Sequence, residues 1–455
     1  MTYDLIVIGA GAGGREAAIL ANANGLKTML VESCFIGGTC VNSGCIPTKF
    51  LLGSTASGHL FAVQKKTKAA EGEIFFNLAQ IQEKKDRYIK ALRSSIEKSV
   101  QTLGIELVYG SASFKDANTI SINTKENEVR EVSFKNCIVA TGSVPAKFPG
   151  VSPDGGNVLS SSSALNLKEA PESMIIVGGG VIGLEMGDFY KRLGTKITLV
   201  EIMDRIALSE DAEVSAALAK QLTREGWQIH TGRKIKEVVS ECEGAVLRFE
   251  DGEELTASKA LIAVGRQPGS KGLEAEKAGI KLFGPGWIET DEYLLAAPGI
   301  YAIGDANKRV LLAHAAEHQA HYAVAHILGR ETGAYNGEPM PSCIYGNNEI
   351  MHVGPHTDQL LKEFKPQGKE VAVSYSQLVA NPIAQSYGCN QGWIKVAWVD
   401  GKVYSVAGWG HGVSHLVTPA TIMVQQHWDK NQIIFAHPTL EESLKSALLA
   451  EKEIL

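Results

Sequence analysis

The chain has 455 residues, which is enough for about three domains of ordinary size. Its 44% of hydrophobic and 21% of charged residues predict a globular protein with a well-buried core. A net charge of −6 without a Lys/Arg cluster argues against a nucleic-acid partner, and no apolar run reaches the roughly eighteen residues of a membrane span. Residues 1–4 carry no basic stretch, so no secretory signal is expected and a cytoplasmic location is predicted.

The first 32 residues form a pattern of strand, glycine loop, helix and strand. The predicted elements are a strand at 3–8, a helix at 15–24 and a strand at 28–31. In the loop, Gly9 would permit a tight turn, Gly11 would let the backbone approach a pyrophosphate, and Gly14 would let helix and strand pack closely. Glu32 follows Gly14 by eighteen residues and is placed to hold a ribose hydroxyl. Because helix N-termini also bind phosphate, the pattern predicts a dinucleotide site.

Residues 37–49 contain two cysteines, Cys40 and Cys45, five positions apart. Gly44 permits a turn between them, and Pro47 suits the first turn of a following helix. A cysteine at a helix N-terminus has a stabilised, reactive thiolate, so a redox-active pair is predicted. The alternative is a structural disulfide or two buried thiols, but lone disulfides in cytosolic proteins are usually catalytic. No metal site is expected, and ordinary thiols are expected at Cys34, Cys137, Cys242, Cys343 and Cys389.

The next hundred residues predict helix followed by sheet. Residues 54–104 are expected to be helical, because apolar residues in their second half recur at helical spacing. This helix is expected to pack on a sheet, with a wall of a dithiol entry path as the alternative. Residues 106–138 alternate and predict a small antiparallel sheet, with Gly110–Ser113 in its first turn and Ala140–Pro145 at its end.

The strand, loop and helix pattern repeats from residue 174. The predicted elements are a strand at 174–177, a helix from Leu184 and a strand at 196–200. Gly178, Gly180 and Gly183 have the spacing of the first three glycines, and Glu201 again follows the third glycine by eighteen residues. Two fingerprints with one spacing predict that the chain binds two dinucleotides, or a dinucleotide and a closely similar cofactor.

The remaining chain predicts mostly strands. Residues 227–263 alternate, Ala263–Pro268 follows them, and Ile300–Ala306 reads as a strand that ends in Gly304 and Asp305. Leu311 is expected to open a helix. Beyond about residue 340 the predicted elements are an antiparallel sheet from 370–379 and 392–408, a helix at 419–428 and a last helix after 435–442.

The order of these motifs resembles the flavin-dependent pyridine nucleotide-disulfide oxidoreductases over nearly the whole chain. Pieces similar to the dihydrolipoamide dehydrogenases within that family are residues 44–49, residues 183–187, Glu201 and residues 437–442. The resemblance implies an α/β fold with two Rossmann-like dinucleotide-binding domains and a C-terminal α+β dimerisation domain. It implies noncovalent FAD, NAD and a homodimer. The implied domains are FAD-binding at 1–146 and 271–340, NAD-binding at 147–270 and dimerisation at 341–455.

The resemblance also implies roles for the candidate catalytic residues. Cys40 would exchange with the substrate sulfur, and Cys45 would pass electrons to the flavin. Thiol exchange requires a base, and His437, which the family supplies from the partner subunit, suits that role because the unperturbed pKa of histidine lies near working pH. Glu442 would pair with His437. The alternative for Glu442 is a capping box with Thr439, and the two roles are not exclusive.

Further residues are implied as cofactor ligands. Lys49 would hold the flavin ring edge and Glu185 would neutralise its charge. An acid at Glu201 favours NAD over NADP, because it binds a ribose diol and repels a 2′-phosphate. The full set of expected cofactor contacts is Gly9, Gly11, Gly14, Glu32, Ser33, Gly38, Thr39, Lys49, Ala112, Thr141, Gly142, Ser143, Gly178, Gly180, Val181, Ile182, Gly183, Glu185, Glu201, Gly265, Gly304, Asp305, Leu312, Ala313 and His314.

The function implied is electron transfer from dihydrolipoamide on a lipoyl protein, through the cysteine pair and FAD, to NAD. The alternatives are an NADH-dependent reductase of another disulfide and a redox-sensing flavoprotein subunit. Two segments depart from the family pattern: residues 345–349 lack the usual Tyr-Thr-x-Pro-Glu, and residues 413–415 lack the usual Ala-x-Glu. Three histidines and Trp409 also stand within residues 408–427. These departures concern the dimer surface and the approach of a lipoyl arm.

Overall fold

The computed structural model describes residues 2–428 and 434–455, and the chain divides into two compact units. Both mix helices and strands, which confirms the predicted α/β class. The first unit consists of Met1–Thr48, Glu83–Lys147 and Gly265–Gly337. The second consists of Lys49–Gln82, Phe148–Val264 and Glu338–Leu455. The three-domain division expected from the sequence stays a prediction.

A seven-stranded sheet forms the centre of the first unit. Its strands are β1 (Thr2–Ile8), β2 (Thr28–Glu32), β3 (Glu106–Asp116), β4 (Thr119–Thr124), β5 (Val129–Val139), β18 (Leu295–Ala297) and β19 (Ile300–Ala302). Strands β3, β2, β1, β5 and β19 run parallel in that order. The second half of β3 and the first half of β5 pair antiparallel with β4 instead. The two long strands therefore belong to both a parallel and an antiparallel part.

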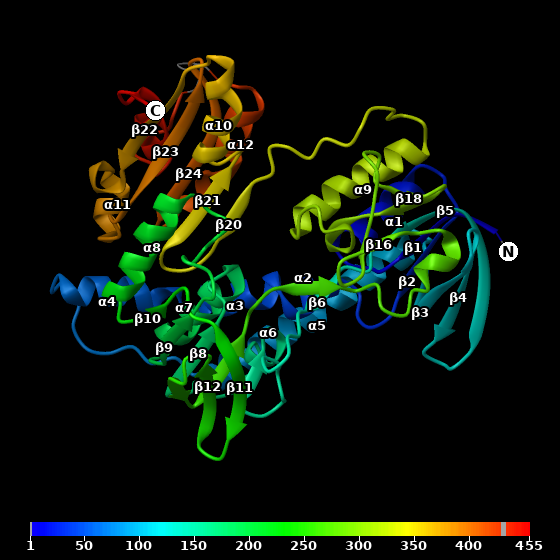
Figure 1. Ribbon diagram of the computed structural model, residues 1–455, viewed down its shortest axis with the longest axis horizontal. Coiled ribbons are helices and arrows are strands. Elements are labelled where there is room, and N and C mark those ends of the chain that lie inside the picture. The colour runs from blue at the N-terminus through cyan, green and yellow to red at the C-terminus, as the bar shows by residue number, and fades with distance from the viewer. Residues whose placement is uncertain (1, 429–433) are drawn as a thin grey trace. The chain divides into compact units, whose positions relative to one another are not determined.

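Helices α1 (Ala12–Ala23) and α9 (Ala313–Ile327) pack side by side in this unit (Figure 1). Their contact consists of alanines such as Ala17 and Ala320, both fully buried. Gly13 fits there because a Cβ at that position would lie 2.8 Å from the Ala316 carbonyl oxygen. Small side chains thus let the helix that follows the first glycine loop lie close to α9.

The second unit contains a parallel sheet in the order β10, β9, β8, β14 and β7. The bounds are β7 (Val158–Ser160), β8 (Ser173–Val177), β9 (Lys196–Val200), β10 (Gln228–His230) and β14 (Lys259–Ile262). An antiparallel sheet beside it consists of β11 (Ile235–Glu241), β12 (Gly244–Phe249) and β13 (Glu254–Ala257). Helices α7 (Val181–Arg192) and α8 (Ala212–Arg224) follow β8 and β9 along the chain. This arrangement is the predicted second nucleotide-binding pattern.

The C-terminal part of the second unit is a six-stranded antiparallel sheet. Its order is β20 (Ser342–Ile344), β21 (Glu349–Val353), β24 (Lys402–Gly410), β23 (Gly392–Val399), β22 (Val371–Gln377) and β25 (Glu453–Ile454). Helices α12 (Val417–Gln425) and α13 (Glu442–Leu449) pack on it, as Figure 1 shows for α12. The remaining helices of this part are α10 (Thr357–Phe364) and α11 (Pro382–Tyr387). Among the described residues, no helix has both the length and the hydropathy to cross a membrane.

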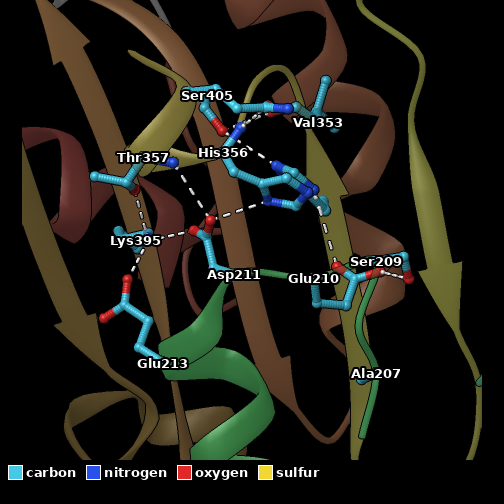
Figure 2. A network of polar contacts seen from close by, with 12 residues as sticks. Ala207, Ser209, Glu210, Asp211, Glu213, Val353, His356, Thr357, Lys395 and Ser405 are labelled. Atoms are coloured by element: carbon cyan, nitrogen blue, oxygen red, sulfur yellow. Dashed lines mark hydrogen bonds and ion pairs between the residues drawn. The ribbon is translucent and has the colours of Figure 1, made fainter. Parts of the chain in front are cut away.

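A buried ionic network ties α8 to the C-terminal sheet (Figure 2). Lys395 on β23 has a side chain only 2% exposed and contacts the carboxylates of Asp211 and Glu213. The Nδ1 atom of His356 lies 2.9 Å from Asp211, and the Thr357 hydroxyl lies 2.9 Å from the Lys395 ammonium group. Burial alone would raise the pKa of Asp211, but the hydrogen bond from His356 and the charge of Lys395 hold it below its usual value. The buried charges are therefore paired, as burial requires.

Two predictions about secondary structure are wrong. Residues 54–104 form two helices, α4 (Ala56–Lys66) and α5 (Leu78–Thr102), separated by a segment that contains Gly72 at φ +94°. Gly110–Ser113 lies inside β3, paired with β4, instead of in a turn. Glycine is required at 110 because a Cβ would lie 2.5 Å from the Asn123 carbonyl oxygen of the neighbouring strand. The glycine thus serves a close approach between strands.

Candidate redox and nucleotide sites

The first glycine loop is held by Glu32 at the end of β2. Its carboxylate accepts hydrogen bonds from the backbone N–H groups of Ala10 and Cys34, both at 2.8 Å. A Cβ at Gly9 would lie 2.3 Å from the Ala140 carbonyl oxygen, and a Cβ at Gly14 would lie 1.9 Å from that of Gly9. Close packing of loop, helix and sheet therefore requires both glycines, as was predicted for Gly14.

The expected flavin contacts in this unit gather where the parallel strands end. Gly9, Ser33, Thr141 and Gly304 each follow closely on the last residue of β1, β2, β5 or β19. On β3, Tyr109 pairs with Glu32 at the end of β2. Ala112 follows Tyr109 on the same strand, so Ala112 also lies beyond the edge where the parallel strands end. Ligands of open α/β sheets bind outside the carboxyl ends of the strands.

The same edge offers polar groups that suit a nucleotide. Helix α1 begins after Gly11 with no side-chain cap, so its first N–H groups are available to phosphate. A Cβ at Gly11 would meet only the Cα of Gly38, at 4.0 Å. The hydroxyl of Thr141 is buried without a hydrogen-bond partner in the described chain. These features fit a bound dinucleotide such as FAD.

A second cluster connects Asp305 with Ser143 and Arg266, and the neighbouring Gly304 contacts α9. The Ser143 hydroxyl donates to the Asp305 carboxylate, and the Gly304 N–H donates to Gln319 on α9 at 2.8 Å. Arg266 donates from Nε to the Ser143 hydroxyl at 2.5 Å and from Nη2 to the Ser143 carbonyl oxygen at 2.6 Å. Sequence reasoning included Arg266 in a motif but missed it as a functional candidate.

The two redox cysteines lie near each other on consecutive helices, α2 (Gly38–Ser43) and α3 (Cys45–Ser54). Cys45 is the first residue of α3, so it has the predicted position at a helix N-terminus. The Arg266 charge also interacts with Cys45: burial lowers the pKa of Arg266, while Asp305 and Cys45 act in the opposite direction. A helix N-terminus and a guanidinium both favour a thiolate at Cys45.

The second glycine loop repeats the construction of the first. Glu201 accepts hydrogen bonds from the N–H groups of Gly179 at 2.7 Å and Met203 at 2.9 Å. Gly178 has φ +109°, and a Cβ there would lie 2.4 Å from the Ala263 carbonyl oxygen. Helix α7 begins at Val181, three residues earlier than predicted, and Gly180 at its N-cap offers no side-chain cap.

Arg205 lies near Glu201 in sequence but is held away from a nucleotide role. Its guanidinium donates to the backbone carbonyl oxygens of Glu210 at 2.8 Å and Leu208 at 3.1 Å, with a weaker contact to Ala207. Because these carbonyls engage both terminal nitrogens, the guanidinium is committed to the loop that follows β9. This contact could not be anticipated from the sequence.

Lys49 and Glu185 form the expected ion pair within the second unit. The Lys49 ammonium group donates to both carboxylate oxygens, at 2.7 and 2.8 Å, and Glu185 is only 4% exposed. Burial raises the pKa of Glu185, and the Lys49 charge opposes this. Tyr345 supplies an N–H to Glu185 at 3.1 Å and its ring lies 4.7 Å from the Lys49 nitrogen.

The departure at residues 345–349 is built around a second buried carboxylate. Gly346 has φ +150°, and a Cβ there would lie 2.8 Å from Oδ2 of Asp188. The same oxygen accepts the N–H of Asn347 at 2.9 Å and a bond from Arg192 at 2.6 Å. Burial raises the pKa of Asp188 to about 6, although Arg192 lowers it. Glycine at 346 is therefore matched to Asp188.

His437 and Glu442 come together at the start of α13. The Nδ1 atom of His437 lies 3.0 and 3.1 Å from the two carboxylate oxygens of Glu442, and its side chain is 74% exposed. Glu442 also accepts the Thr439 N–H at 3.2 Å, but the Thr439 hydroxyl donates to the Ala436 carbonyl oxygen. Only half of the alternative capping box therefore forms. The hydrogen bond from His437 lowers the pKa of Glu442.

Two glycine loops, a cysteine pair and a His–Glu pair are the features expected of an oxidoreductase that binds two nucleotides and acts on a dithiol. The sequence profile of the pyridine nucleotide-disulphide oxidoreductases matches residues 3–320, and that of their dimerisation domain matches residues 340–448. The chain belongs to this family. The family binds FAD, and its dihydrolipoyl dehydrogenases use FAD and NAD, so the predicted enzyme class and cofactors are confirmed.

Several known proteins are similar over their whole length. The dihydrolipoyl dehydrogenase of Chlorobaculum tepidum is 36% identical, with 98% of this chain and 96% of the relative covered. Dihydrolipoyl dehydrogenase 3 of Pseudomonas aeruginosa is 32% identical, with 98% and 97% covered. The crystal structure of LpdA from Mycobacterium tuberculosis has a TM-score of 0.89 at 25% identity, covering 98% of this chain and 99% of that one. The HOCl-induced flavoprotein disulfide reductase RclA of Escherichia coli, at 22% identity, shares the fold with a TM-score of 0.87.

Proposed function

We propose that this chain is an NAD-linked dihydrolipoyl dehydrogenase that oxidises a lipoyl dithiol through Cys40 and Cys45. The observation that carries the proposal is the pair of neighbouring cysteines on α2 and α3, with Cys45 at the N-terminus of α3. A thiolate leaving group is stabilised there. The names of the relatives with 36% and 32% identity support the same substrate class.

The chemistry at the cysteines is a pair of thiol–disulfide exchanges. A substrate thiolate attacks Sγ of Cys40 in the oxidised pair, the Cys40–Cys45 bond breaks, and Cys45 leaves as a thiolate. The second substrate thiol then attacks the mixed disulfide, which releases a cyclic lipoyl disulfide and the Cys40 thiol. Bound FAD would supply two-electron transfer between the reduced pair and NAD.

His437 would accept the protons of the substrate thiols. Its Nδ1 faces Glu442, so an N–H at this position leaves the lone pair on Nε2 as the basic atom. The Glu442 carboxylate then stabilises the charged ring. By resemblance to the family, the partner subunit's His437 would serve the cysteines of this chain, so a homodimer would form the complete site.

The nucleotide contacts follow from the two loops. The first loop, together with Thr141, Ser143 and Asp305, would hold FAD, and the second, with Glu201, would hold NAD. Lys49, neutralised by Glu185, would lie at the flavin ring edge. The division into FAD domain (1–146 and 271–340), NAD domain (147–270) and dimerisation domain (341–455) belongs to this proposal, as do a cytoplasmic location and a lipoyl protein as the partner.

Turnover of free dihydrolipoamide with NAD tests the proposal directly. The His437→Gln variant should lose about two to four orders of magnitude in this rate, because a general base is removed, and should retain its flavin content. Mixed dimers of His437→Gln and Cys40→Ser subunits should recover activity, since one site of each dimer is complete. No turnover with any dithiol would reject the substrate. Inactive mixed dimers would place His437 and the cysteines of one chain in the same site.

A further inference from the structure

Three potential metal ligands from distant parts of the sequence meet in the second unit. His59 lies on α4, Cys389 follows α11, and His411 follows the last residue of β24. None of the three belongs to the redox or nucleotide sites described above. Because each lies alone in its own segment, no spacing of residues in the sequence predicts a metal site here.

The ligand atoms are already close to the geometry of a bound ion. One sulfur and two imidazole nitrogen atoms, one from each residue, all lie within 4.8 Å of one another. The Sγ atom of Cys389 lies 3.5 Å from Nε2 of His59. In a tetrahedral zinc site with ordinary Zn–S and Zn–N bonds, that edge measures about 3.6 Å. Rotation of the imidazoles would close the remaining distance.

One of the imidazoles also has a ring nitrogen that no other group in the described chain engages. The Nδ1 atom of His411 is buried without a hydrogen-bond partner among the described residues, so a bound cation could use it.

We propose that His59, Cys389 and His411 bind a thiophilic divalent cation, with Zn²⁺ as the ion that this donor set fits best. One thiolate and two imidazoles are three protein ligands of a tetrahedral site, and water would fill the fourth position. Because a thiol ligates a metal ion as the thiolate, binding displaces one proton from Cys389, and no oxidant or reductant is required.

A bound cation would fasten α4 to the C-terminal sheet. His59 comes from the segment Lys49–Gln82, whereas Cys389 and His411 flank β23 and β24 in the chain. The ion would join segments more than three hundred residues apart, as the separation of 330 between His59 and Cys389 shows. A ligand that binds only the folded chain stabilises it by mass action.

The test uses Co²⁺ as a spectroscopic probe on the FAD-loaded full-length protein. Cys40→Ser and Cys45→Ser are introduced so that the redox pair cannot bind metal. One equivalent of Co²⁺ per chain should bind and give a near-ultraviolet thiolate-to-metal band, and Zn²⁺ should displace it. Cys389→Ser should remove the band. His411→Gln and His59→Gln should weaken binding by more than about 100-fold, because loss of an outer-shell group alone costs up to that factor.

Matched controls are Cys242→Ser and His415→Gln, which change an exposed thiol and a nearby histidine outside the cluster. Both should bind Co²⁺ as the parent does. Flavin content and circular dichroism verify that each variant is folded. The proposed site would be overturned if the parent protein did not bind one saturating equivalent of Co²⁺, or if the thiolate band persisted in Cys389→Ser. Cys389 and His59 would then form only a thiol–imidazole hydrogen bond. Because no step measures turnover, failure here is separate from failure of the proposed dehydrogenase activity.

Discussion

The two glycine loops share one construction but differ in what surrounds them. In each, a glutamate at the end of a strand accepts two backbone N–H groups, and the third glycine leaves no room for a Cβ. Beside the first loop, Gly38 of α2 approaches Gly11, and a Cβ at Gly38 would lie 2.7 Å from the Cα atom of Gly11. Beside the second, a Cβ at Gly180 would meet nothing within 4 Å. At this glycine α2 therefore approaches the first loop and no described residue approaches the second, a difference that fits the proposed retained FAD and exchanging NAD.

The largest expected effect comes from the third glycine of each loop. Gly14→Ala should abolish flavin binding, because the new Cβ would lie 1.9 Å from the Gly9 carbonyl oxygen. Gly183→Ala has an equivalent clash, at 2.1 Å from the Gly178 carbonyl oxygen, but should retain flavin and lose NADH oxidation by about 100-fold. Flavin absorbance and steady-state rates separate the two. Equal loss of flavin in both variants would break the assignment of the loops.

The buried hydroxyl of Thr141 sharpens the assignment of the first loop. It has no partner in the described chain, so Thr141→Val should leave the stability of the apoprotein unchanged. The same variant should weaken FAD binding roughly tenfold, the value of one buried hydrogen bond. Reconstitution of the parent and variant apoproteins, followed by flavin fluorescence, gives the FAD affinity of each. Thr102→Val, at an exposed helix end, is the control. Unchanged FAD affinity would remove Thr141 from the cofactor site.

Cofactor preference tests the second loop. Glu201→Gln should narrow the preference for NAD over NADP roughly fivefold, because it removes a negative charge from a partly exposed position. Arg205→Gln should leave NADP use unchanged, since its guanidinium is committed to backbone carbonyls. The ratio of kcat/KM for the two nucleotides measures both effects. A loss of NADP turnover in Arg205→Gln would show that Arg205 reaches the 2′-phosphate.

The smallest effect concerns the ionic network of the second unit. Burial lowers the pKa of His356, but its hydrogen bond to Asp211 raises it above the usual value. The stability that His356 contributes is therefore complete below its ordinary pKa of about 6.5 and is lost as pH rises through the folded value. His356→Gln should lower Tm by roughly 2 °C at pH 6 and by less at pH 9. A deficit that grows with pH would contradict this sign.

Local patterns account for what the sequence predicted correctly. Each of these predictions depends only on residues close in sequence. They concern the glycines at 9 and 178, the carboxylates eighteen residues after the third glycine of each loop, and Cys45 at the start of a helix. Gly110 was misread as a turn residue because the need for glycine arises on the neighbouring strand. The break between α4 and α5 was not predicted, because apolar residues recur at helical spacing only in the second half of 54–104 and the predicted helix was extended over the residues before it.

Residues whose roles depend on distant partners could not be predicted. In the sequence Arg266 is an isolated charge, and only folding places it against Ser143, which is 123 positions away. Lys395 lies in an apolar strand, and its partner Asp211 is 184 positions away. The periodicity of hydrophobic residues does not reveal such pairs, because each partner alone is compatible with an ordinary surface charge.

The order of strands in the first sheet has a consequence for synthesis. Strand β5 ends at Val139, but β19, which covers its second edge, begins at Ile300 and pairs with it from Cys137. At ordinary translation rates the ribosome would need roughly 10–30 s to produce the intervening chain. During that time the nascent β5 presents unpaired N–H and C=O groups, a template for pairing with other chains. Completion of the sheet must therefore wait for residues about 160 positions downstream, and chaperones have that interval in which to act.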